Sequence, residues 1–150
     1  MKLELFRIVL ATACLATPSL LALGQPLDSD TPAERLRCPD RPNCVNSRVD
    51  RDLPPLQHNG PPDSAMRRLK ATLAGFPEAT IEREAGLELE VIFTTRLGFR
   101  DQVTFVVDEA GKQIDFRSRS LIGYYDFGKN RSRMLIFSSA FARTSGANPP

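Results

Sequence analysis

The sequence predicts an α+β domain in which an antiparallel sheet of about four strands packs against two helices. Apolar residues recur at helical spacing over residues 66–76 and 134–141, and four short runs with strand-like alternation lie between them. Short loops join these runs. Strands connected in this way pair antiparallel, and one face of their sheet then remains for two amphipathic helices.

The first 24 residues are expected to be a secretory signal peptide. An early positive charge precedes an apolar run, residues 8–23, that is too short and too interrupted to span a membrane. Small residues at the end of this run predict cleavage before Gln25. The alternative is a lipoprotein cut at Cys14, which would attach the protein to a membrane by a lipid anchor. In both cases we expect an exported protein, periplasmic or extracellular.

Residues 25–62 are expected to form an irregular, Pro-rich arm that carries a disulfide between Cys38 and Cys44. Loss of the signal peptide leaves only these two cysteines, and an even pair in an exported protein indicates a disulfide. A zinc site, with ligands from His58 and nearby carboxylates, and a redox-active pair are the alternatives. The residues around His58 suggest that its side chain lies in solvent on a loop.

The domain proper is expected to cover residues 63–143, and it begins with a helix. Asp63 or Ser64 can cap this helix after two prolines, and Gly75 and Pro77 end it. Its apolar stripe consists of Met66, Leu69, Leu73 and Phe76.

Four strands are expected next, at residues 80–83, 87–94, 103–107 and 113–118. Alternation places one face of the second strand in the core, and that face consists of Leu87, Leu89, Val91 and Phe93. Between the third and fourth strands, Gly111 is expected to supply the positive φ of a hairpin turn.

A final helix is expected over residues 130–143. Its apolar stripe consists of Met134, Phe137, Ala140 and Phe141. Residues 144–150 are expected to form a disordered tail.

Composition and charge exclude several classes of function. A single histidine excludes a His-rich metal centre, and the chain contains no G-x-S-x-G, H-E-x-x-H or phosphate-binding glycine motif. Residues 25–95 have nine basic and twelve acidic side chains, a net charge of −3, whereas residues 96–150 have nine and five, a net charge of +4. The basic half suits anionic headgroups, a phosphate or a carboxylate, although solvated arginines are a simpler explanation. We expect no cofactor, no metal and no nucleic-acid partner.

Three stretches of the chain have the spacing of a family motif: CPDRPNCVNS, FRDQVTF and RSRSLIGYYDFGKNR. Together they resemble the domain-of-unknown-function 1499 family, small bacterial and plastid proteins without an assigned activity. Residues 38–47 (CPDRPNCVNS) are similar to its C-P-x-x-P-N-C-V-S-S signature. Residues 99–105 (FRDQVTF) are similar to F-x-D-D-V-x-F, and residues 117–131 (RSRSLIGYYDFGKNR) to R-S-x-S-R-x-G-x-x-D-x-G-x-N-R. The resemblance covers about residues 36–142 and implies a fold unit without implying a reaction.

The chain departs from these motifs at three positions. Asn46 replaces a serine, and Leu121 stands where the family often has a basic residue. Gln102 replaces an aspartate, which weakens any mechanism that needs paired carboxylates.

The same segment supplies the candidate ligand-binding residues. They are Arg100, Asp101, Arg117, Ser118, Ser120, Tyr124, Asp126, Asn130 and Arg131. Strand alternation places both serines on the core face, where they would line a polar pocket, and turns Arg117 to the other face. In the competing interpretation these residues only stabilise the fold. Asp126 caps the last helix or a preceding turn, and Gly123 and Gly128 adopt positive φ. Asn130 forms a hydrogen bond with its own backbone, and Arg117 pairs with Asp101.

Two classes of function follow from these residues. The first is a non-enzymatic binding or envelope-maintenance module for an anionic or amphiphilic ligand or a partner protein, in contact with a membrane only peripherally. The alternative is a hydrolase in which Asp101 and Asp126 act as a carboxylate pair, with Arg100 or Arg117 stabilising an anion. The sequence assigns no catalytic residue beyond that hypothesis.

Overall fold

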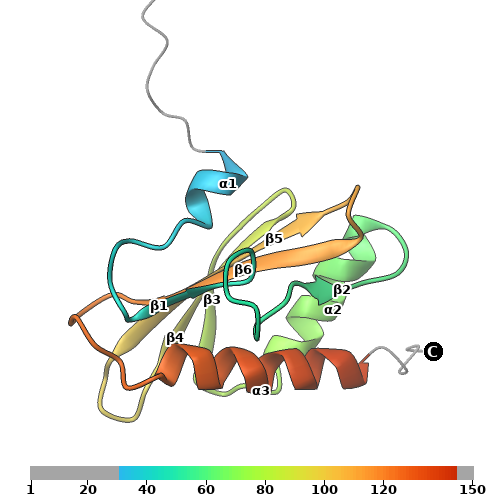
Figure 1. The fold of residues 1–150 in the computed structure, drawn as a ribbon. Coiled ribbons are helices and arrows are strands. Elements are labelled where there is room, and N and C mark those ends of the chain that lie inside the picture. The colour runs from blue at the N-terminus through green and yellow to red at the C-terminus, as the bar shows by residue number, and fades with distance from the viewer. Residues whose placement is uncertain (1–30, 145–150) are drawn as a thin grey trace, which may run out of the picture.

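The computed structural model describes residues 31–144 (Figure 1). The expected signal peptide, the alternative lipidation site at Cys14 and the predicted tail from residue 145 onward lie outside the described residues.

A six-stranded antiparallel sheet packs one face against two long helices (Figure 1). The strand order is β1-β6-β5-β4-β3, and β2 also pairs with β6. The elements in chain order are α1 (Pro32–Arg35), β1 (Cys44–Asn46), β2 (Leu56–Gln57), α2 (Pro62–Leu73), β3 (Ala79–Ala85), β4 (Glu88–Thr94), β5 (Arg100–Asp108), β6 (Gln113–Ser120) and α3 (Lys129–Arg143). The expected α+β class and antiparallel sheet are confirmed. No described helix has the length and apolar character needed to cross a membrane.

The expected numbers of strands and helices were too low, because the arm contains three short elements of its own. α1 has four residues, β1 has three and β2 has two. Elements of that size show neither the helical nor the strand period, so the pattern of the sequence cannot reveal them. β1 and β2 both pair with β6 and thereby make part of the arm an edge of the sheet.

The core lies between the sheet and the helices α2 and α3. The expected apolar faces are confirmed, since Leu89, Val91 and Phe93 of β4 are all fully buried. Aromatic rings join the layers: Phe137 of α3 lies 5.1 Å from Phe105 of β5, measured between ring centroids. β3, at the outer edge of the sheet, is mostly exposed and has a bulge between Ile81 and Arg83.

Two local expectations about the chain were wrong. Pro61 is the N-cap of α2 and no side chain caps it, so neither Asp63 nor Ser64 has the expected role. In the β5–β6 turn the positive φ, 51°, belongs to Lys112 instead of Gly111. A Cβ atom at Gly111 would lie 2.6 Å from a carboxylate oxygen of Asp108, so a larger residue at this position would require the Asp108 side chain to shift.

His58 does not lie in solvent, because its side chain is only 3% exposed. It follows β2, where alternation buries Leu56 and His58 and exposes Gln57. Neither ring nitrogen has a hydrogen-bond partner among the described residues. The expectation that His58 is exposed to solvent was therefore wrong, because the short strand β2 directs its side chain into the protein.

Candidate functional site

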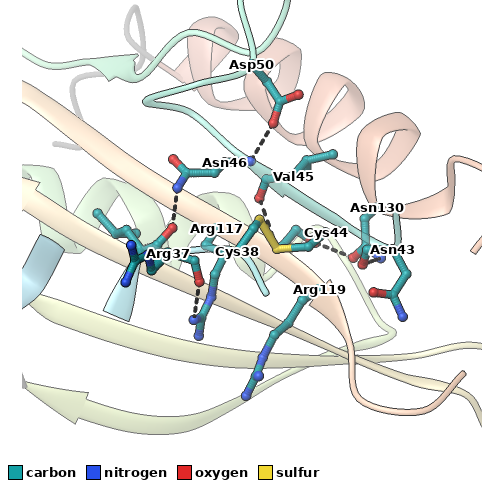
Figure 2. Close-up of a disulfide and its surroundings, with 12 residues drawn as sticks. Arg37, Cys38, Asn43, Cys44, Val45, Asn46, Asp50, Arg117, Arg119 and Asn130 are labelled. Atoms are coloured by element: carbon teal, nitrogen blue, oxygen red, sulfur yellow. Dashed lines mark hydrogen bonds between the residues drawn. A yellow bond between two sulfur atoms is a disulfide. The ribbon is translucent and has the colours of Figure 1, made fainter. Parts of the chain in front are cut away.

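The disulfide between Cys38 and Cys44 closes a short loop at the start of β1 (Figure 2). This confirms the expected pairing. Cys44 lies opposite Arg119 in β6, so the loop is fixed to the sheet on one side. On the other side, the side chain of Asn46 donates a hydrogen bond to the carbonyl oxygen of Leu36.

Reduction of this disulfide is expected to lower the free energy of unfolding by about 2 kcal/mol, since only a short, proline-stiffened loop is released. Urea denaturation of the oxidised protein, the reduced protein and the double variant Cys38→Ala/Cys44→Ala measures the difference. The reduced and double-variant midpoints should agree with each other and lie below that of the oxidised protein. Equal midpoints in all three samples would contradict the expected contribution.

Asn130, in the first turn of α3, is the centre of a buried polar network at one end of the sheet. Its side chain is fully buried. The amide nitrogen is 2.8 Å from Asp126 Oδ2 and 3.0 Å from Ser120 Oγ. It is also 3.1 Å from the carbonyl oxygen of Asn43, while Ser118 Oγ donates to the amide oxygen at 2.5 Å. The network therefore joins β6, α3 and the disulfide loop.

A buried ion pair extends the network to β5. Arg133 Nη2 lies 2.6 Å from Asp101 Oδ2, and both side chains are almost completely buried. Ser120 donates to the other carboxylate oxygen of Asp101 at 2.5 Å, and Arg133 Nη1 donates to Asn130 at 3.2 Å. The sequence did not point to Arg133. Within this network every hydrogen bond ends on another member or on the backbone beside it.

Asp126 fixes the loop that leads into α3. One carboxylate oxygen accepts from the backbone N–H of Gly128 at 3.1 Å, and the other accepts from that of Asn130 at 2.7 Å. Gly123 and Gly128 have φ values of 88° and 73°, as the scaffold interpretation expected. Asn130 differs from that interpretation, because its side chain bonds other side chains and the backbone of Asn43 instead of its own backbone.

The remaining candidate residues do not join the network. Arg117 lies on the opposite face of the sheet, so the expected pair with Asp101 was wrong and Arg133 takes that place. Arg100 is exposed and forms an ion pair with Glu82 at 3.2 Å. Tyr124 is exposed in the loop after β6.

Arg131 connects α3 to the arm. It lies 2.6 Å from Asp50 and also forms an ion pair with Asp52. The hydrogen bond from Arg131 lowers the pKa of Asp52, and the same two carboxylates raise the pKa of Arg131. Arg131 therefore has a structural partner in the part of the chain that the structure describes.

Two neighbouring loops expose most of the large apolar side chains of the described surface. We call them the tip: residues 95–99, between β4 and β5, and residues 121–128, between β6 and α3. The exposed apolar residues of the tip are Leu97, Phe99, Leu121, Ile122, Tyr124, Tyr125 and Phe127. Phe127 is 91% exposed and Leu97 is 84% exposed. The backbone N–H of Leu121 donates to the carbonyl oxygen of Arg100 at 3.0 Å, so both loops lie at the same end of the sheet (Figure 1).

The charge around the tip is positive. The basic side chains Arg96, Arg100 and Lys129 are exposed beside the apolar residues. Asp126 is the one acidic residue in residues 95–100 and 121–129, and its carboxylate accepts hydrogen bonds from Gly128 and Asn130. These two stretches therefore have a net charge of +2.

A cavity of about 370 Å³ lies elsewhere, between the arm and α3. Leu53, Pro55, Leu56, Arg68 and Phe141 contribute to its lining, and none of the nine candidate residues does. Within residues 31–144, no group of three or more His, Cys, Asp or Glu side chains is placed to hold a metal ion.

A family model described as "Protein of unknown function (DUF1499)" matches residues 36–141. No curated protein matches the chain.

Proposed function

Because the chain belongs to the DUF1499 family, whose description gives no activity, we propose its function from the surface: a non-enzymatic module that binds an anionic lipid bilayer peripherally through its tip. The observation that carries this proposal is the clustering of seven exposed large apolar side chains on two adjacent loops. The signal peptide expected before Gln25 would bring the protein to the cell envelope.

The chemistry of the tip suits the boundary between lipid headgroups and acyl chains. Contiguous exposed apolar patches are uncommon on monomeric soluble proteins and often mark contact with a partner or a membrane. Tyrosine and phenylalanine place an apolar ring in such a boundary, and the tyrosine hydroxyl stays in the polar layer. A basic side chain near an anionic surface adds about 1 kcal/mol of attraction. Arg96 and Lys129, each within two residues of an exposed apolar residue of the tip, supply this attraction, whereas Arg100 is paired with Glu82.

The buried network holds the longer tip loop in position. Asn43 donates to the carbonyl oxygen of Gly123 at 2.7 Å, and Asp126 accepts from the backbone after Phe127. Phe127 has a φ of 53°, a left-handed conformation that is unfavourable for a phenylalanine. Fixed surroundings are needed to maintain such a conformation, and here they keep the ring exposed. The candidate residues Asp126 and Asn130 thus position the longer tip loop through their hydrogen bonds, and the exposed apolar side chains of that loop make the proposed contact with lipid.

Both carboxylates of the hydrolase hypothesis have structural partners within the protein. Asp101 is paired with Arg133, and Asp126 accepts hydrogen bonds from the backbone. No observation within the described residues favours hydrolysis, so that hypothesis stays a prediction of the sequence.

The double variant Ile122→Ser/Phe127→Ser is expected to bind anionic vesicles about 100-fold more weakly, since two large apolar side chains can no longer enter the lipid. Co-sedimentation of the processed, purified protein with vesicles of phosphatidylglycerol and phosphatidylcholine measures this partitioning. Vesicles of phosphatidylcholine alone should bind the unmodified protein more weakly, and added salt should weaken its binding to the anionic vesicles.

The matched control is Val49→Ser/Ile136→Ser, which removes two exposed apolar side chains from outside the tip. We expect this variant to bind like the unmodified protein. The proposal is wrong if the unmodified protein fails to sediment with anionic vesicles. It is also wrong if the tip variant and the control variant bind equally.

A further inference from the structure

Two arginines of β6 lie on the outer face of the sheet, which faces away from the core. Arg117 and Arg119 are two residues apart on one strand, so their side chains share this face. Figure 2 shows both side chains beside the disulfide, extending in the same general direction. Arg117 is only 9% exposed, and Arg119 is half-buried at its side.

Within the described residues, Arg117 and Arg119 donate hydrogen bonds only to neutral acceptors. Arg117 donates to the carbonyl oxygen of Arg37 at 3.1 Å and, over longer distances, to Thr104 at 3.3 Å and Gln102 at 3.4 Å. Arg119 donates to the same oxygen of Gln102 at 3.0 Å. The buried Nε of Arg117 has no hydrogen-bond partner within the described residues. Within the described part of the chain, neither Arg117 nor Arg119 forms an ion pair. Burying a charge without a partner of opposite charge lowers the stability of the fold.

The carboxylates of the outer face are engaged with other arginines. Asp115 pairs with Arg48 at 2.7 Å, and Glu90 pairs with Arg83 at 3.1 Å. Glu88 is shared between Arg83 at 2.5 Å and Arg35 at 2.8 Å.

Burial lowers the pKa of Arg117, and the positive charge of Arg119 lowers it further, while Glu90 and Glu88 act in the opposite direction. The carboxylates of Glu90 and Glu88 therefore do not fully offset the lowering of the Arg117 pKa by burial and by the charge of Arg119.

We propose that Arg117 and Arg119, with Gln102 between them, form a binding site for a small oxyanion, a carboxylate or a phosphate. A guanidinium group presents parallel N–H donors that fit the oxygen pairs of both groups. The half-buried Arg119 contacts the anion directly, and Arg117 behind it contributes charge in a site from which water is largely excluded. This site is independent of the tip, because it lies on the face of the sheet and needs no lipid.

Thermal unfolding with inorganic phosphate or succinate, against sodium chloride at equal ionic strength, tests the site. We expect one of the two anions, at a concentration far above its Kd, to raise the Tm of the unmodified protein by about 5 °C. The anion that does so identifies the class of ligand. If neither anion raises the Tm above the chloride value, the proposal is overturned.

Gln102→Glu is the most informative variant, because it places a carboxylate of almost the same shape between the two guanidinium groups. We expect its Tm in chloride to rise and its response to the anion to disappear, since the internal carboxylate takes the place of the ligand. Arg119→Gln should lose the response without that rise in Tm, and it keeps the test valid if Gln102→Glu folds poorly.

Arg67→Gln, which removes an exposed arginine of α2, is the control and should respond like the unmodified protein. A full response in both Gln102→Glu and Arg119→Gln would overturn the proposal.

Discussion

Asp101→Asn is expected to lower the free energy of unfolding by about 3–5 kcal/mol, the largest stability effect that the structure suggests for a single polar side chain. The substitution keeps the size of the side chain and removes its charge. The guanidinium group of Arg133, which lies 2.6 Å from the carboxylate and is almost fully buried, is then left without a counter-charge. Breaking one partner of a buried pair costs more than the pair contributes, because a desolvated charge remains.

Urea denaturation of four proteins tests this explanation: the unmodified chain, Asp101→Asn, Arg133→Met and Asp101→Asn/Arg133→Met. The double variant should be more stable than the sum of the single effects predicts, because neither charge is then left alone. Arg100→Gln, which removes the neighbouring exposed arginine, should change stability by less than about 0.5 kcal/mol. A small effect of Asp101→Asn, or additive single effects, would mean that the ion pair is not desolvated as the structure shows.

Asn130→Ala is expected to cost about 3 kcal/mol, since one truncation removes partners from several buried polar groups at once. Ser118 and Ser120 lose the amide group, and the carbonyl oxygen of Asn43 loses a donor. The same change removes one of the contacts that hold Asp126. We therefore expect faster hydrogen exchange of backbone amides in residues 121–128, in addition to a lower denaturation midpoint.

Asn59→Ala is a matched control, because Asn59 is exposed. It should alter neither the midpoint nor the exchange rates of residues 121–128. If Asn130→Ala lowered stability but left exchange in that loop unchanged, the network would support the sheet and helix without ordering the tip.

The sequence predicted the two longer helices and the four longer strands, β3 to β6, because each is long enough to show its period. The face of β4 that contains Leu89, Val91 and Phe93 could be assigned from alternation alone. The same rule correctly placed Ser118 and Ser120 at the core side of β6, where they meet Asn130. β1 and β2 could not be predicted, since their pairing depends on backbone hydrogen bonds to β6 that no side-chain pattern records.

The candidate site could be predicted only in part, because the sequence shows the spacing of residues along the chain and does not show contacts between distant segments. Spacing identified Asp126 and Asn130 but did not reveal that they bond each other and the disulfide loop across the fold. Arg133 was missed, although a signal for it existed. Asp101 shares the face of Val103 and Phe105, so its carboxylate faces the core and requires a cationic partner. Arg133 lies three residues after Asn130, on the helix face that turns toward the sheet.

The arrangement of the sheet edges also affects how the protein behaves at high concentration. A free edge strand offers unpaired N–H and C=O groups to other chains and favours aggregation. At one side β1 and β2 cover β6 and leave only very short strands at the rim. At the other side, the bulge in β3 between Ile81 and Arg83 disrupts the regular ladder, and Glu82, Arg83 and Glu84 place charges along it. Both edges therefore resist strand-to-strand association, so the exposed apolar residues of the tip can be tolerated without the sheet itself becoming a template for fibres.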